Sequence, residues 1–231
     1  MPAPTRTAFY DLDGTLVSCN VVTRYAFFAK SHPSRARAFL KYTKLLASVP
    51  LLIALDLYSR RLFNVVFYRE YRGLKKKWLE EQSERLFEEV IRPSIYPGAK
   101  ALLDRDREEG FRLVLVTGAL DFDLGPVRRY FGFDDVICNS LVYENGTATG
   151  EVASPLIAEA EKQAALMRLC REYNVDTARS KAYSDSFSDL PMLEAVGLPA
   201  AVNPDPRLRR AALERGWPIL DLKRGNHVDA R

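Results

Sequence analysis

Short apolar runs alternate with amphipathic segments along most of this chain. Apolar, β-branched runs predict buried strands, and apolar residues three and four positions apart predict helices. The predicted strands are Thr7–Tyr10, Arg112–Thr117, Val136–Cys138, Lys181–Ser184 and Ala200–Val202, and the predicted helices are Gly98–Glu109, Asp121–Tyr130, Ser154–Glu172, Asp189–Val196 and Pro206–Arg215. The sequence Glu144-Asn145-Gly146, between β-favouring residues, adds a hairpin. Strands that alternate with helices predict an α/β fold, in which helices cover both faces of a parallel sheet.

The stretch from about Val21 to Val90 departs from this alternation. It holds long helix-favouring runs with apolar residues at helical spacing and a single glycine. Residues 18–95 carry 15 Lys/Arg and 7 Asp/Glu, a net charge of +8 in a chain whose total charge is +4. A break in both pattern and charge typically marks a domain boundary. We therefore predict a core of residues 1–17 and 97–231, with an all-helical cap, residues 18–96, inserted after the first strand.

Composition narrows the class of protein. Hydrophobic residues are 47% and charged residues 28% of the 231 positions, a globular balance that excludes a disordered or fibrous chain. The three cysteines, Cys19, Cys138 and Cys170, lack metal-ligand spacing, and their odd number excludes a disulfide scaffold and favours a reducing compartment. No secretory leader is evident before the first strand, and the longest apolar run, Leu45–Leu55, is shorter than the ~20 residues of a membrane-spanning helix. We expect a cytoplasmic protein.

Polar residues with catalytic potential gather where the predicted strands end. They are Asp11, Asp13, Thr117, Lys162, Asp185 and Asp189. Because the carboxyl ends of parallel strands meet at one edge of a sheet, these groups are expected to converge there. Several carboxylates repel one another unless a cation lies among them, and Mg²⁺ is the hard divalent ion that suits oxygen ligands. Such an ion and Lys162 would neutralise a phosphoryl group, while Thr117 and the following backbone N–H groups would hold its oxygens.

These residues belong to four motifs that resemble those of the haloacid dehalogenase superfamily of phosphohydrolases. Phe9-Tyr10-Asp11-Leu12-Asp13-Gly14-Thr15-Leu16-Val17 is similar to the first motif. The second motif is matched by Thr117 and the third by Lys162. The fourth is matched by Tyr183-Ser184-Asp185-Ser186-Phe187-Ser188-Asp189, and all the motifs follow the family's order. The insert lies between the first and second motifs, as in the phosphoserine phosphatase branch. The resemblance implies a Rossmann-like core, a helical cap that selects the substrate, and Mg²⁺-dependent hydrolysis of a small, phosphoserine-like phosphomonoester. The apolar and basic residues of the insert would also admit a lipid-like phosphomonoester.

The resemblance also implies a role for each residue. Asp11 is the nucleophile that forms an aspartyl-phosphate, and Asp13 is first the general acid and then the base. Their spacing in extended backbone directs both side chains to one side of the strand. The implied phosphate-binding residues are Thr117, Gly118 and Lys162, the implied metal ligands are Asp11, Asp185 and the backbone carbonyl of Asp13, and Asp189 is implied to orient metal-bound water or Lys162.

Two positions depart from the family pattern. Ser188 stands where the fourth motif commonly has asparagine, and it is implied to support water or phosphate positioning. Asn20 stands where phosphoserine phosphatases have a glutamate for the substrate ammonium, which makes it a substrate-selecting position and argues against phosphoserine itself.

Taken singly, these residues have plainer explanations. Asp-Gly is ordinary turn chemistry, a lone helical lysine is usually solvated, and Asp185 and Asp189 suit the start of a helix. Four motifs in the family's order favour the catalytic interpretation.

The cap leaves alternatives open. Tyr42–Phe67 is strongly apolar and carries the basic residues Lys44, Arg60 and Arg61, with Lys41 beside it. Such helices suit an anionic membrane surface, and the first alternative is a membrane-peripheral protein with little catalysis. They also suit packing on each other above the active site, which we expect because a cap must build its own small core. The second alternative is a phosphotransferase that uses the same aspartyl-phosphate. No basic motif with interleaved aromatic residues supports binding to nucleic acid.

Overall fold

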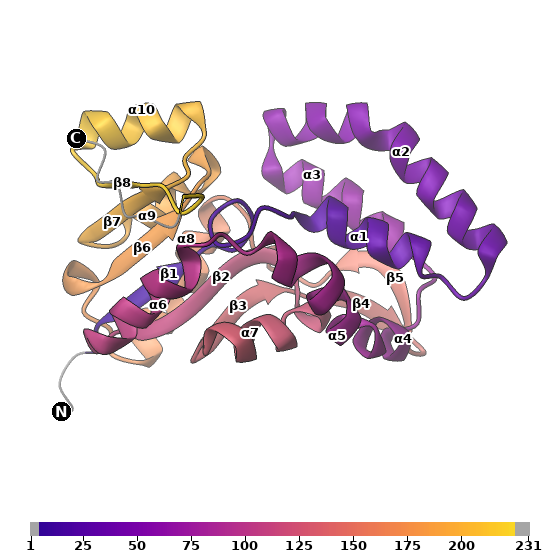
Figure 1. Cartoon of the computed structure of the whole chain (residues 1–231), viewed down its shortest axis with the longest axis horizontal. Coiled ribbons are helices and arrows are strands. Elements are labelled where there is room, and N and C mark those ends of the chain that lie inside the picture. The colour runs from indigo at the N-terminus through magenta and orange to yellow at the C-terminus, as the bar shows by residue number, and fades with distance from the viewer. Residues whose placement is uncertain (1–4, 225–231) are drawn as a thin grey trace.

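The computed structural model describes residues 5–224, and a six-stranded parallel sheet forms its centre (Figure 1). The strands follow the order β3-β2-β1-β6-β7-β8, and they are β1 (Thr7–Tyr10), β2 (Arg112–Leu120), β3 (Asp135–Asn139), β6 (Lys181–Ser184), β7 (Leu198–Val202) and β8 (Ile219–Leu220). β1 lies between β2 and β6, so that Tyr10 is opposite Leu115 on one side and Tyr183 on the other. The predicted α/β fold is confirmed.

Helices cover both faces of this sheet. They are α6 (Ala99–Glu108), α7 (Gly125–Phe131), α8 (Ala160–Glu172), α9 (Leu190–Glu194) and α10 (Pro206–Arg215). Alternate residues of a strand point to opposite faces. Phe9 therefore packs in one hydrophobic cluster with residues of α8, α9 and α10, whereas Ala8 and Tyr10 pack in another with residues of α6 and α7. Because β1 is packed on both faces, the position of the loop that follows it, which contains Asp11 and Asp13, is set by the core.

Several boundaries differ from those predicted. β1 and α10 have the predicted bounds, but α8 begins at Ala160 rather than Ser154. The Asn139 side chain explains the delay, because its Oδ1 accepts from the backbone N–H of Ile157 (2.7 Å) and its Nδ2 donates to the carbonyl of Ile157 (3.3 Å). These bonds satisfy the backbone at Ile157 outside a helix. β8 was not predicted, because two residues are too few for a pattern.

Residues 21–94 contain helical segments and connecting turns, with no named strand. The α-helices are α1 (Val21–Lys30), α2 (Arg35–Tyr58), α3 (Arg60–Phe67), α4 (Lys76–Glu81) and α5 (Ser83–Leu86), and the remaining turns are 3₁₀ at Tyr68–Tyr71, π at Phe87–Ile91 and 3₁₀ at Arg92–Ser94. Asn20 caps α1, because its side chain accepts from the backbone N–H groups of Val22 and Thr23.

An antiparallel hairpin of the core, β4 (Leu141–Glu144) and β5 (Thr147–Val152), holds this helical segment in place. The backbone N–H of Gly73 donates to the carbonyl of Ala148 (2.9 Å), and the N–H of Ala148 donates to the carbonyl of Leu74 (2.8 Å). The chain entering α4 thus adds to the edge of the hairpin. The helices are anchored to the core by backbone hydrogen bonds as well as by apolar packing.

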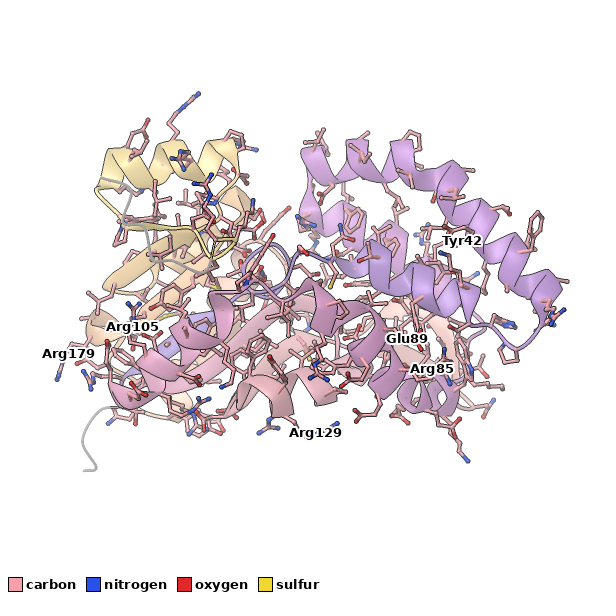
Figure 2. All side chains as sticks on the ribbon, viewed as in Figure 1. Tyr42, Arg85, Glu89, Arg105, Arg129 and Arg179 are labelled. Carbon is pink, nitrogen blue, oxygen red and sulfur yellow. The ribbon has the colours of Figure 1, made fainter. Side chains whose placement is uncertain are left out.

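The expectation that the apolar residues of Tyr42–Phe67 pack on each other is wrong for the outer face of α2. Leu45 and Leu52 are buried against the rest of the helical segment, but Leu51 is 57% and Leu57 78% exposed. α2 lies along the outer edge of the molecule, and Tyr42 lies on its inner side towards α1 (Figures 1 and 2). The short apolar run Leu45–Leu55 belongs to a longer helix than expected: α2 continues through Pro50, and it is long and apolar enough, by length and composition, to cross a membrane. Core helices pass that test too, but only 11% of the most apolar 18-residue window of α2 is buried.

Candidate active site

One cleft at the carboxyl edge of the sheet brings together all six polar residues singled out above. Asp11 and Asp13 follow β1, Thr117 lies in β2, and Lys162 lies in the first turn of α8. Asp185 follows β6, and Asp189 ends a 3₁₀ turn before α9. The cleft is also lined by Gly118, Ser186, Ser188, Val21, Arg60, Asn64, Ile157 and Ala158.

The Lys162 ammonium joins two of the carboxylates at the bottom of the cleft. Its Nζ lies 2.6 Å from Oδ1 of Asp11 and 2.7 Å from Oδ2 of Asp189, and all three side chains are at least nine-tenths buried. Ser184 also donates to Oδ2 of Asp189 (2.7 Å). Asp189 is therefore held from two sides and faces the lysine rather than solvent.

Thr15 lies between the other pair of carboxylates. Its hydroxyl oxygen is 3.2 Å from Oδ2 of Asp11 and 3.2 Å from Oδ1 of Asp185, and it accepts from the backbone N–H of Asp185 (3.0 Å). Gly14 makes this approach sterically feasible, because a Cβ at that position would lie 2.0 Å from Oδ2 of Asp185. Its φ of +85° is also one that residues with a side chain rarely adopt.

Burial dominates the electrostatics of these groups. It raises the pKa of Asp11 to about 6, although Lys162 acts in the opposite direction. Burial, followed by the neighbouring charge of Asp11, raises the pKa of Asp185 well above its ordinary value. Burial alone would lower the pKa of Lys162, but Asp11 and Asp189 outweigh it and raise that pKa. Asp11 is thus a buried carboxylate and Asp185 a half-buried one, and one ammonium does not balance their charges.

This imbalance fits a bound divalent cation. Within residues 5–224, no three acidic, histidine or cysteine side chains converge closely enough to enclose a metal ion by themselves. The carboxylates of Asp11 and Asp185 both lie within hydrogen-bond distance of the Thr15 hydroxyl, so they are close to each other. Mg²⁺ typically binds one or two carboxylates and completes its coordination shell with water and other oxygens. The residues present therefore suit Mg²⁺ if the carbonyl of Asp13 and water provide further ligands.

Thr117 offers a free hydroxyl proton to the cleft. Its side chain is buried, and its Oγ1 accepts from the backbone N–H of Ala119 (3.1 Å), which leaves the O–H available as a donor. The pairing of β2 with β3 shifts register between Val116 and Leu120, so the regular ladder is interrupted at Thr117 and Gly118. This interruption is what allows a strand segment to face a ligand.

Arg24 is a charged residue of this site that sequence reasoning missed. Its side chain is fully buried, contacts Oδ1 of Asp13 through Nη2, and lies 3.8 Å from Oδ2 of Asp123 through Nη1. Within residues 5–224, neither Nε nor Nη1 has a hydrogen-bond partner. Burial raises the pKa of Asp123 to about 7 in spite of the arginine. A signal was present, because Arg24 lies between Val21 and Phe28 on the apolar face of α1.

Arg60 and Asn64 bring polar groups of the helical segment into the cleft, and they were not predicted as site residues either. They lie one helical turn apart on α3, and both line the cleft. Asn64 is 2% exposed, and no group in the described part of the chain accepts a hydrogen bond from its Nδ2. Arg60 pairs with Asp56 (3.0 Å), and Asp189, Asp11 and Asp13 contribute to its raised pKa.

The two departures from the family pattern lie in different places. Ser188 lines the cleft, and its hydroxyl lies 2.9 Å from that of Ser186. Asn20 is exposed and is not among the residues that line the cleft, and its side-chain Oδ1 accepts from the backbone N–H groups that open α1.

Comparison with known proteins finds the same combination of fold and motifs elsewhere. A family model described as "haloacid dehalogenase-like hydrolase" matches residues 8–194. A Streptomyces azureus protein named "Inhibition of morphological differentiation protein" is 34% identical over 227 residues, which cover 96% of this chain and 80% of that protein. A probable phosphatase of Mycobacterium tuberculosis (strain ATCC 25618 / H37Rv) is 30% identical over 225 residues, 96% of this chain and 77% of that protein. A phosphoserine phosphatase of the same strain is 28% identical over 228 residues, 95% of this chain and 71% of that protein.

Solved structures share the fold. A Bordetella pertussis Tohama I protein of unknown function has a TM-score of 0.82 at 25% identity, and the match covers 95% of this chain and 100% of that one. A phosphoserine phosphatase, solved as an analogue of its phospho-aspartyl intermediate, has a TM-score of 0.68 at 17% identity over 95% of this chain and 94% of that one. At that identity the likeness concerns the fold.

Proposed function

This chain belongs to the haloacid dehalogenase-like hydrolases and is a phosphatase of that family, and we propose that it hydrolyses small phosphomonoesters through a phosphoryl intermediate on Asp11. The observation that carries this proposal is the position of Asp11, held by Lys162 at 2.6 Å beside Asp13 and Thr117 in one cleft. A nucleophile, a proton donor and phosphate-binding groups are then within reach of one phosphorus atom.

In the first step a carboxylate oxygen of Asp11 attacks phosphorus as the bond from phosphorus to the ester oxygen breaks. Asp13 donates its proton to the departing oxygen, so that an alcohol leaves. In the second step water attacks the same phosphorus and gives a proton to Asp13. The bond from phosphorus to Asp11 breaks, inorganic phosphate is released, and the carboxylate is restored.

Other residues prepare the cleft for these steps. Lys162 and the Thr117 hydroxyl would bind the equatorial phosphoryl oxygens, on which negative charge accumulates. Arg24 would hold the Asp13 side chain in position, since the guanidinium contacts it from a fully buried site. Mg²⁺ on Asp11, Asp185 and the Asp13 carbonyl would screen the charge between the phosphate and the carboxylates. Asp189 would keep Lys162 in place.

We propose that residues 18–96 act as the cap and that α3 helps to choose the substrate. Arg60 and the unpaired Nδ2 of Asn64 are donors at the cleft wall, so they suit a leaving group that carries a negative charge or another hydrogen-bond acceptor. An amino-acid phosphate has such a carboxylate, and one relative is named phosphoserine phosphatase. Phosphoserine phosphatases have a glutamate at the position of Asn20 for the substrate ammonium. In this chain Asn20 caps α1, so a substrate ammonium would not meet a carboxylate at that position.

A cytoplasmic location is part of the same proposal. Cys19, Cys138 and Cys170 are free thiols, and Cys19 and Cys170 are buried. Free thiols persist where the compartment is reducing.

The proposal is tested with p-nitrophenyl phosphate and the variant Asp11→Asn. We expect turnover that needs added Mg²⁺, stops with a chelator and disappears in the variant, while the circular dichroism spectrum is unchanged. Trapped phosphate on the wild-type protein, absent from Asp11→Asn, would report the intermediate. Turnover by Asp11→Asn would overturn the proposal. If an added alcohol captures the phosphoryl group in preference to water, the chain is a phosphotransferase.

A further inference from the structure

We propose that the outer face of α2 docks on the surface of an anionic lipid bilayer. The inference rests on an apolar helix face without a partner in the described residues, on the basic charge around it, and on its continuity with the mouth of the active site. It does not depend on the phosphatase activity.

The outer face of α2 is a broad apolar strip. Phe39, Leu46, Pro50, Ile53 and Leu57 are spaced by seven, four, three and four residues, which places them on one side of a helix. Phe39 is 73%, Leu46 54% and Ile53 56% exposed. Leu40, Leu51 and Tyr58 widen the strip. A contiguous apolar surface of this kind typically marks an interaction site.

The opposite side of α2 is fixed to the protein. Leu45 and Leu52 are buried, and the helix packs against α1 and α3. Lys41 donates to the carbonyl of Glu70 (3.0 Å), and Lys44 pairs with the side chain of Glu70 (2.8 Å). With one side held along its length, α2 presents its apolar strip sideways, as a helix lying in the interface plane does, rather than crossing the bilayer.

Charge selects an anionic lipid surface over a second copy of this chain. From Arg35 to Phe67 there are six Lys/Arg and one acidic residue. Three of the six are neutralised by partners: Lys41 and Lys44 contact Glu70, and Arg60 pairs with Asp56. Arg35, Arg37 and Arg61 are exposed near the ends of α2. Two such faces brought together would repel each other, whereas an anionic leaflet attracts each Lys/Arg that approaches it.

The strip ends beside the catalytic cleft. Leu57 and Tyr58 line a groove that also contains Arg60, Asp185 and Ser188, which line the cleft as well. Docking through α2 would therefore bring the mouth of the active site close to the lipid headgroups.

The test is flotation of the full chain with phosphatidylcholine vesicles and with vesicles of phosphatidylcholine and phosphatidylglycerol in equal parts. The triple variant Leu46→Ser/Leu51→Ser/Ile53→Ser removes apolar contacts, and Arg35→Gln/Arg37→Gln/Arg61→Gln removes charge. Leu213→Ser is the matched control, since Leu213 is 59% exposed and belongs to α10 rather than to the strip on α2. Circular dichroism and turnover of p-nitrophenyl phosphate confirm that each variant folds.

We expect the wild type and Leu213→Ser to float with the anionic vesicles, and both triple variants to bind at least tenfold more weakly. Added salt should release the protein. Failure of the wild type to bind, or equal binding by the apolar triple variant, would overturn the proposal. A wild-type dimer in sedimentation velocity that Leu46→Ser/Leu51→Ser/Ile53→Ser dissociates, without vesicle binding, would also overturn it and assign the strip to a second copy. Loss of turnover by Asp11→Asn leaves all of these outcomes unaffected.

Discussion

Replacing Arg24 with methionine tests how the buried charges behind the active site are balanced. Methionine keeps most of the length and apolar volume of the side chain but removes its charge. Arg24 is fully buried and contacts Asp13, and it lies 3.8 Å from Asp123. The Asp123 side chain is only 3% exposed, so water cannot replace the arginine there.

The cost of the substitution should depend on pH. At pH 5 Asp123 is protonated in the folded wild type, because its pKa is about 7, and it is protonated in the variant as well. The variant then loses mainly the charge-assisted bond to Asp13, about 2 kcal/mol of the free energy of unfolding. At pH 8 the wild type has lost the proton, whereas the variant retains it because nothing offsets the burial of Asp123.

Proton binding by Asp123 determines how the destabilisation by Arg24→Met changes with pH. Unfolded Asp123 is ionised at both pH values, so a folded variant that keeps one extra proton becomes less stable by about 1.4 kcal/mol for each pH unit above 7. We therefore expect Arg24→Met to lower the free energy of unfolding by about 2 kcal/mol at pH 5 and by about 3–4 kcal/mol at pH 8.

Urea unfolding followed by circular dichroism at the two pH values measures this difference. Arg35→Met is the matched control, since Arg35 is exposed and should change stability by less than about 0.5 kcal/mol. Measured against the single variant Asp123→Asn, the double variant Arg24→Met/Asp123→Asn should lose the same free energy of unfolding at both pH values. A loss below about 1 kcal/mol at pH 8, or one equal at both pH values, would refute the reasoning.

Three further predictions concern the cleft. Lys162→Met should abolish hydrolysis of p-nitrophenyl phosphate and lower the free energy of unfolding by about 3–5 kcal/mol, because it leaves two buried carboxylates unpaired; retained turnover contradicts this. Gly14→Ala should cost about 2 kcal/mol or more in urea unfolding, because its Cβ would collide with the Asp185 carboxylate. The control Gly73→Ala has a similar φ of +83° but open space around it, and an equal cost would mean that only backbone strain matters. Asn64→Ala should lower kcat/KM for a carboxylate-bearing phosphomonoester about tenfold without destabilising the protein. An unchanged kcat/KM would show that Asn64 does not help to select the substrate.

The sequence alone predicted β1, β2, β3, β6 and β7, the order of the motifs and the grouping of Asp11, Asp13, Thr117, Lys162 and Asp185. These depend on local patterns: a short apolar run followed by a polar residue predicts a strand end, and parallel strands bring their ends to one edge. The start of α8 was missed, since Asn139 binds the backbone of Ile157 from a distant part of the chain.

Only the tertiary structure decided what covers each helix face. Periodicity shows which residues share a face, but Leu45 and Leu51 are equally apolar in sequence, and one is buried while the other is exposed. Arg24 illustrates the converse, since a basic residue in a basic segment became a buried partner of Asp13 when α1 packed on the core. Burial depends on neighbours that arrive from other segments of the chain, and a one-dimensional pattern does not contain them.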